Sequence, residues 1–136
     1  MNSNDTQEFG YLTVRVSTAR GAIPLAGAVV NVRDGEDSAT VLYSLISDGD
    51  GKTEKVALRT PPAENSDFPE GATAYALYNV DVFKEGYIPL YFHNVPIFPS
   101  VISVQPAVMI PEAGGVTSGM GNVTETPPSD IERGEI

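Results

Sequence analysis

The stretch that decides the fold is residues 78–87, YNVDVFKEGY. Its first five residues alternate apolar side chains with Asn79 and Asp81, which is the period of a strand with one dry face and one wet face. Residues 84–86 then supply a tight turn, and a second apolar run follows at residues 87–92. Two strands joined in this way cannot bury their apolar faces alone, so we expect the preceding sequence to form an opposing layer.

Other stretches have the same strand-like pattern and are separated by turn sequences. The clearest turn is residues 48–51, DGDG, because Asp and Gly tolerate the positive φ that hairpin turns need. We expect Pro96 and Pro99 to interrupt a short crossover, and Pro106 to mark a sheet edge or a bulge. The expected strands are residues 11–17, 28–33, 40–47, 52–59, 73–83, 87–94 and 101–110. In the sequence before residues 78–87, the side chains expected to face inward are Leu12, Val14, Val16, Ala28, Val30, Val32, Val56 and Leu58.

These patterns define the fold class and the domain plan. Seven short strands joined by turns, with no helical periodicity, predict an all-β protein, a seven-stranded antiparallel β-sandwich. A chain of 136 residues has the size of one domain with a single core. We expect the sandwich at residues 10–111, a flexible N-terminal arm at residues 1–9, and a surface loop at residues 60–71. Residues 112–136 carry five acids against Arg133 alone, which predicts a disordered acidic C-terminal tail.

The charge balance limits the partners. Eight basic and eighteen acidic residues give a formal charge of −10, which argues against binding to nucleic acid or to an anionic membrane surface. No apolar run approaches the ~20 residues of a membrane span. The chain has no cysteine, so neither a disulfide nor a thiolate metal site is available. The polar start MNSNDTQE does not have the pattern of a signal peptide, so export by that route is not indicated, and the compartment stays open.

Three local motifs carry a resemblance to a known family. They are residues 21–30, GAIPLAGAVV, residues 47–52, SDGDGK, and the YNVDV strand with its following Gly86-Tyr87. In this order, they resemble the motifs of carboxypeptidase-regulatory-like domains across residues 10–110. The resemblance implies a sandwich of the transthyretin (prealbumin) type with Greek-key connections.

A narrower resemblance concerns residues 10–16, GYLTVRV, residues 92–98, FHNVPIF, and residues 103–106, SVQP. These are similar to the accessory domain of clostridial spore-cortex-lytic enzymes and related peptidoglycan-associated proteins, where the module sits beside a catalytic or wall-binding domain. This chain has no hydrolase domain and ends in an acidic segment. The resemblance therefore implies an accessory or binding role in a Gram-positive cell-wall or spore-cortex setting, and not cortex lysis itself.

No group of residues indicates reaction chemistry. His93 is the only histidine and has no nucleophile motif or second histidine beside it in the sequence, so a surface or structural role is favoured. Hydroxyisourate hydrolases related to transthyretin use several histidines, which disfavours that activity here. Asp48, Asp50 and Glu54 have calcium-like spacing, but position 59 is Arg59 where a calcium loop would need Glu. We therefore expect no catalytic residue, no metal, no cofactor and no enzymatic activity.

The aromatic residues allow two interpretations. Packing within the sandwich is favoured, since aromatic side chains are its usual filling. The alternative is a face that binds carbohydrate or protein, with Tyr75, Tyr91 and His93 as the outward candidates. The predicted function is a non-catalytic binding or accessory module whose partner is a protein or a peptidoglycan or other carbohydrate. The alternatives are a structural subunit of a surface or phage-like assembly, a homo-oligomer formed through edge strands, and, disfavoured, a small transthyretin-like hydrolase.

Overall fold

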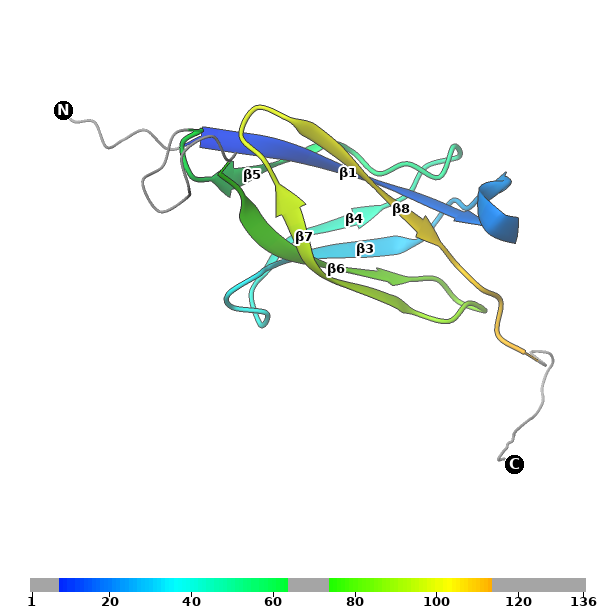
Figure 1. Cartoon of the computed structure of the whole chain (residues 1–136). Coiled ribbons are helices and arrows are strands. Elements are labelled where there is room, and N and C mark those ends of the chain that lie inside the picture. Colours follow the sequence, from blue (N-terminus) through cyan, green and yellow to red (C-terminus); the bar gives the residue numbers. More distant parts are fainter. Residues whose placement is uncertain (1–7, 64–73, 114–136) are drawn as a thin grey trace.

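Two four-stranded β-sheets face each other and form a sandwich (Figure 1). The structure, a computed structural model, describes residues 8–63 and 74–113. The strands are β1 (Glu8–Thr18), β2 (Ile23–Pro24), β3 (Val29–Asp34), β4 (Val41–Ile46), β5 (Val56–Thr60), β6 (Ala76–Phe83), β7 (Leu90–Ile97) and β8 (Ile102–Val108), with one short 3-10 turn, η2 (Ala19–Gly21). The all-β sandwich expected from the sequence is confirmed.

The strand count and one pairing differ from the expectation. Eight strands are formed instead of seven, because the two residues of β2 pair with the end of β1. The first sheet, called sheet A below, contains β2, β1, β5 and β8, and the second, sheet B, has the order β4-β3-β6-β7. All pairs are antiparallel except β1 and β8, which run parallel. The predicted arm, surface loop and acidic tail lie mostly outside the described residues, although β1 already begins at Glu8.

The core lies between the two sheets and is built by the alternation seen in the sequence. All eight side chains expected to face inward are buried, and so are Tyr78, Val80 and Val82 of β6. The largest fully buried side chains are Leu12, Ile97 and Met109, each exposed by no more than 1%. Since burying one such side chain contributes about 1.5–3 kcal/mol, this continuous core is the main stabilising feature of the fold.

The outer side of β6 differs from the expected wet face. Asn79 and Asp81 point away from the core, yet they are exposed by only 8% and 7%. Arg33 Nε donates to Asp81 Oδ2 at 2.6 Å, and Asn79 Oδ1 accepts from the Asn94 backbone N–H at 3.0 Å. Both of these buried side chains therefore have a polar partner.

The end of β7 is also different from the prediction. We expected this strand to stop at Asn94, with Pro96 in a crossover, but β7 continues to Ile97. Asn94 has a φ of 60° beside an irregularity in the β6–β7 register, and the strand resumes after it. Pro96 is tolerated because β7 is an edge strand, where a missing N–H costs no ladder bond. Pro106 also lies in an edge strand, β8, as predicted.

Among the described residues, no helix has the length and apolar character to cross a membrane.

Candidate functional site

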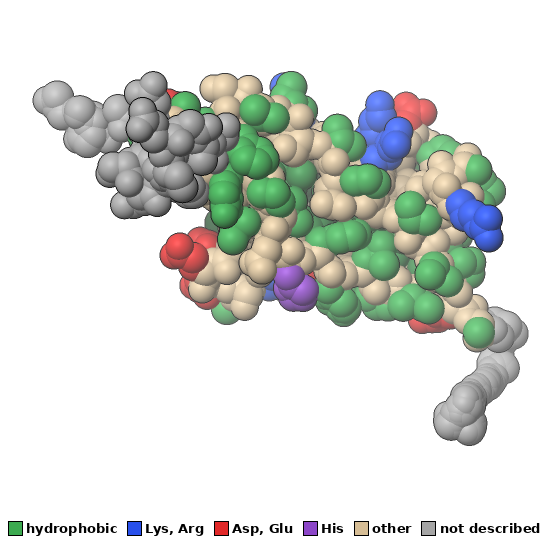
Figure 2. Space-filling model, viewed as in Figure 1, with side chains coloured by type: hydrophobic (Ala, Val, Ile, Leu, Met, Phe, Trp, Pro, Cys, Tyr) green, Lys and Arg blue, Asp and Glu red, His purple; other side chains and the backbone are tan. Residues whose placement is uncertain are grey.

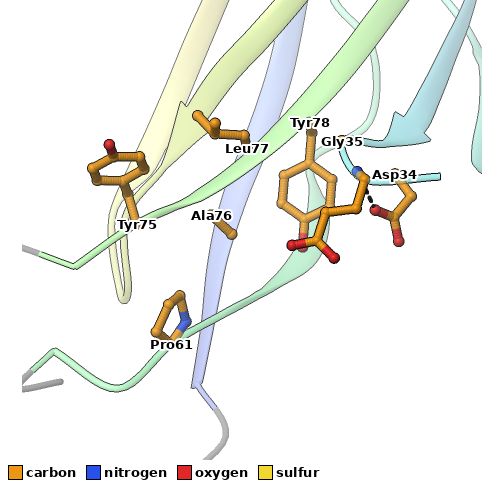
Figure 3. A pocket seen from close by; sticks show the side chains of 8 residues that line it. Asp34, Gly35, Pro61, Tyr75, Ala76, Leu77 and Tyr78 are labelled. Carbon is orange, nitrogen blue, oxygen red and sulfur yellow. Dashed lines mark hydrogen bonds between the residues drawn. The ribbon is translucent and has the colours of Figure 1, made fainter. Parts of the chain in front are cut away.

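A cleft of about 460 Å³ opens at one end of the sandwich, beside the start of β6 (Figure 3). Three segments that are far apart in the sequence line it. Residues 34–36 follow β3, Pro61 follows β5, and residues 75–78 enter β6. The β3–β6 register brings the first and third segments together by pairing Asp34 with Tyr78, and Pro61 comes from the facing sheet. The complete lining is Asp34, Gly35, Glu36, Pro61, Tyr75, Ala76, Leu77 and Tyr78.

The acidic wall of this cleft is held by a turn. Asp34 Oδ1 accepts the backbone N–H of Glu36 at 2.8 Å and that of Asp37 at 3.4 Å, so its carboxylate orders the turn that follows β3. Gly35 lies so close to β6 that an added Cβ would be 2.0 Å from the Leu77 carbonyl oxygen. Only glycine permits this approach of the two backbones. The turn therefore places two carboxylates beside the aromatic entry to β6.

Tyr78 forms the inner wall and joins the two sheets. It is exposed by 7%, and its hydroxyl donates to the Arg59 carbonyl of β5. Burial raises the pKa of Tyr78 above its usual 10.0, and the nearby Asp34 carboxylate adds to this rise, while Arg59 opposes it. A second hollow of about 380 Å³ shares Asp34 and Tyr78 with the cleft and extends towards Tyr43 and Arg59. Tyr43 makes a similar link between the sheets, since its hydroxyl donates to the Ala57 carbonyl at 2.8 Å.

The arrangement combines apolar walls with hydrogen-bond acceptors. Tyr75, Leu77 and Pro61 offer an aromatic ring and aliphatic surface, and Tyr75 and Leu77 are each 39% exposed. Asp34 and Glu36 accept hydrogen bonds from hydroxyl or ammonium groups and repel anions. The cleft thus suits a ligand that has an apolar face and hydroxyl or cationic groups.

The three residues proposed from the sequence do not form one site. Tyr75 lines the cleft, and its ring meets the edge of Phe98 at 5.9 Å between centroids. Tyr91 lies on the outer face of sheet B, 56% exposed, with its ring 5.8 Å from that of Phe83. His93 is exposed on the same strand, β7, where Figure 2 shows the histidine on the surface. Tyr91 pairs with Asp81, six positions along β6 from Tyr75, which is roughly 20 Å at the rise of a strand.

Several residues of the cleft were missed in the sequence. Asp34 and Glu36 were not named as candidates, Pro61 fell in the expected surface loop, and Leu77 fell in the expected strand at residues 73–83. The local pattern did show a polar turn after one strand and a Pro-rich segment after another. The missing information was the pairing of β3 with β6, since this long-range register decides which turns meet at the same end.

Among the described residues, no three His, Cys, Asp or Glu side chains gather in a way that would hold a metal ion. The Asp48 carboxylate instead orders the predicted hairpin turn. Its Oδ1 accepts the backbone N–H of Asp50 at 2.9 Å and that of Lys52 at 3.0 Å.

No protein-family model and no curated protein matches the chain. Three similar solved structures are a hydroxyquinol 1,2-dioxygenase from Pseudomonas putida (16% identity, TM-score 0.51), the TIE protein of Bacillus anthracis (13%, 0.49) and a type II cohesin–X-dockerin complex from Acetivibrio cellulolyticus (13%, 0.44). They cover 77%, 75% and 75% of this chain, which spans 57%, 16% and 58% of theirs. The matched part of this chain therefore spans less than two thirds of each of these proteins.

The likeness to the dioxygenase corrects one expectation. We predicted no enzymatic activity because no group of residues in the sequence indicates reaction chemistry. That prediction is wrong, because the same fold occurs within an enzyme, a hydroxyquinol 1,2-dioxygenase. At 16% identity the likeness shows the fold and not the reaction. These observations establish that the chain is a β-sandwich module whose candidate site is the cleft beside Tyr75.

Proposed function

We propose that the chain is a binding module that recognises a protein or peptidoglycan partner at the cleft beside Tyr75. One observation carries the proposal, which is the convergence of Tyr75, Leu77, Asp34 and Glu36 around about 460 Å³ at one end of the sandwich. Loops and turns at the end of a rigid β-scaffold are a common place for recognition. A cleft of this size accepts a single side chain or a sugar unit rather than a folded surface.

The chemistry of the lining supports such a partner. A sugar ring has apolar faces for an aromatic side chain and hydroxyl groups for carboxylates, and a peptide can offer a Lys or Arg side chain to the same groups. The cleft's two carboxylates disfavour an anionic ligand. A cell-wall or spore-cortex setting is supported by the sequence resemblance to accessory domains of cortex-lytic enzymes, and we include it in the proposal on that ground.

The test is retention of the full chain on purified peptidoglycan and cortex fragments, followed by calorimetry with the fragments that retain it. We expect Tyr75→Ala to weaken binding roughly tenfold, because it removes the exposed ring of the cleft. Tyr91→Ala is the matched control, since it removes another exposed tyrosine, on the outer face of sheet B and outside the cleft, and should leave the affinity unchanged.

Two outcomes would contradict this proposal. If Tyr75→Ala and Tyr91→Ala lost the same amount of affinity, the cleft would not be the binding site. Absence of retention on wall fragments, together with defined oligomers in light scattering, would favour a structural subunit of a larger assembly.

A further inference from the structure

The outer face of sheet A has a charge opposite to that of the whole chain. On β1, the residues that alternate with the buried Leu12, Val14 and Val16 point outward, and Arg15 is among them. Arg15 pairs with Lys52, and Phe9, another outward residue of β1, pairs with Arg59. Lys52 and Arg59 therefore lie on the same face as Arg15. Lys55 Nζ lies 5.2 Å from the centre of the Tyr11 ring, which places a fourth cation there.

The one acidic residue in the β1–β5 register is Glu8, which pairs with Thr60 and lies, by the alternation along β1, on the same side as Leu12. Glu54 lies in the same stretch of sequence as Lys52 and Lys55 but pairs with no residue of β1. The described residues that the pairing and the cation–π contact place on this face therefore have four positive charges, whereas the chain carries −10. Such segregation creates a local field that attracts negatively charged partners.

An apolar strip borders these cations along β8. Ile102, Val104 and Val108 are 57%, 55% and 41% exposed. Their register partners on β1 are Tyr11, Thr13 and Ser17. Figure 2 shows hydrophobic side chains along the course of β8, with Lys or Arg side chains beside them. An exposed apolar strip of this kind is typical of an interaction surface.

The backbone of β8 also offers unused hydrogen-bonding groups. The Val101 carbonyl accepts from the Tyr11 N–H at 2.9 Å, and the Met109 N–H donates to the Ser17 carbonyl at 2.7 Å, so odd-numbered residues face β1. Backbone groups of the residues between them point to the opposite edge. Among the described strands, none pairs with β8 there. Pro106 removes one donor from this edge, and its carbonyl already accepts from Gln105 Nε2 at 2.9 Å. The N–H groups of Ile102, Val104 and Val108 remain for a partner.

We propose that β8 is a docking edge for an extended, acidic peptide segment of a partner protein, which adds to sheet A as a further strand. The edge supplies backbone hydrogen bonds, the apolar strip supplies contact area, and the four cations select for negative charge. An added strand would lie about two strand spacings, roughly 10 Å, from Arg15 on β1, and about three, roughly 15 Å, from Lys52 and Arg59, which pair with the opposite edge of β1. The attraction should therefore weaken as salt is raised.

A second copy of the chain is a less suitable occupant. Pairing β8 with β8 of another copy would place two faces of four positive charges each side by side, and like charges repel. A nucleic acid would match the charge but would leave the edge N–H groups and the apolar strip without complementary partners, and the overall charge of −10 opposes it.

The experiment is an NMR titration of the full chain with a peptide in which Glu and Thr alternate. Two probes serve as controls, namely the same peptide with Lys in place of Glu, and the acidic peptide with alternate backbone nitrogens methylated. We expect the acidic peptide to shift the β8 resonances and both controls to bind at least roughly tenfold more weakly. Higher salt should weaken binding of the acidic peptide.

Variants on the protein side separate the backbone from the side chains. Val104→Pro removes an edge N–H that makes no bond to β1, and we expect it to weaken binding roughly tenfold, whereas Val104→Thr keeps the N–H and should bind nearly as well as the parent. If Val104→Pro fails to fold, the methylated peptide tests the same hydrogen bonds. Lys55→Gln together with Arg15→Gln should weaken binding and reduce its salt dependence, while Lys84→Gln, outside the face, should change neither.

Several outcomes would overturn the proposal. They are equal binding of the acidic and Lys-containing peptides, full binding of the methylated peptide, tighter binding of a single-stranded oligonucleotide, or sedimentation of a dimer that Val104→Pro abolishes. Tyr75→Ala should leave binding of the acidic peptide unchanged, so failure at this edge and failure of the cleft are distinguishable.

Discussion

At the scale of single residues, two buried threonines of similar chemistry have opposite environments. Thr53 Oγ1 accepts the Val14 N–H at 3.0 Å, whereas Thr60 Oγ1 is buried with no hydrogen-bond partner among the described residues. A buried hydroxyl without a partner costs about 1–3 kcal/mol. Among the described side chains, Thr60 is therefore the one local defect of this kind, at the end of β5 and next to the cleft residue Pro61.

Replacement of each threonine by the isosteric valine tests this difference. We expect Thr60→Val to raise the free energy of unfolding by about 1 kcal/mol, and Thr53→Val to lower it by about 1–3 kcal/mol because it leaves the Val14 N–H unsatisfied. Urea unfolding at neutral pH measures both. A loss of stability in Thr60→Val equal to that in Thr53→Val would show that the Thr60 hydroxyl has a partner.

Tyr78 makes stability dependent on alkaline pH. Burial, assisted by Asp34, raises the pKa of Tyr78 in the folded state above 10.0, so above that pH the unfolded chain releases the tyrosine proton first. Stability is then fully present below pH 10.0 and falls as the pH rises towards the higher folded-state pKa. Tyr78→Phe lacks this ionisation but also loses the hydrogen bond to the Arg59 carbonyl.

The expected result is a difference between parent and variant that depends on pH. Tyr78→Phe should be less stable by about 1 kcal/mol at neutral pH, and the difference should shrink as the pH rises past the ordinary tyrosine range. Unfolding by urea at a series of pH values measures it, with absorbance of the tyrosinate as a second readout. A difference that stays constant with pH would contradict the raised pKa.

At the scale of elements, strand ends are joined by buried polar side chains. Ser47, just after β4, is 4% exposed, and its Oγ donates to the Leu25 carbonyl at 2.7 Å and accepts the Ala28 N–H at 3.0 Å. We expect Ser47→Ala to lower the free energy of unfolding by about 2 kcal/mol, because two buried backbone groups lose their partner. Ser44→Ala on the exposed face of β4 is the control and should change it by less than about 0.5 kcal/mol. If Ser47→Ala and Ser44→Ala changed the stability equally in thermal unfolding, the structural role of Ser47 would be contradicted.

Much of the strand pattern was predictable because burial repeats with a period of two. Val30 and Val32, or Val80 and Val82, are buried wherever polar residues alternate with them. Pairing over long distances was not predictable. The parallel contact of β1 with β8 joins residues about ninety positions apart, and nothing in either segment specifies the direction of the other. The two residues of β2 have no pattern of their own and form a strand only because β1 extends past β5 to meet them.

At the scale of the whole molecule, the candidate site was even harder to predict from the sequence than the pairing of the strands. Tyr75 was identified from the sequence as an outward aromatic candidate, together with Tyr91 and His93. Its partners Asp34 and Pro61 come from other strands, and only the assembled sandwich brings their turns to one end. The charged face of sheet A was hidden in the same way, since the net charge of −10 conceals four cations that one sheet collects. Composition therefore predicted the net charge of the molecule but not how positive and negative charges are distributed over its surface.

The assembled core also makes a prediction about the unit that folds. The buried hydrophobic side chains that the structure describes extend from Leu12 to Met109. Beyond them, the backbone N–H of Glu112 donates to the Gly86 carbonyl at 2.9 Å. A chain of residues 8–113 keeps all these contacts, so we expect it to unfold cooperatively with a midpoint within about 3 °C of that of the full chain. Calorimetry of both chains measures this. A further truncation after residue 107 is the control, since it removes the buried Met109 and should lower the midpoint by at least about 8 °C. If the chain of residues 8–113 lost as much, the boundary of the sandwich expected at residues 10–111 would be wrong, because residues beyond it would then contribute to the stability of the folded unit.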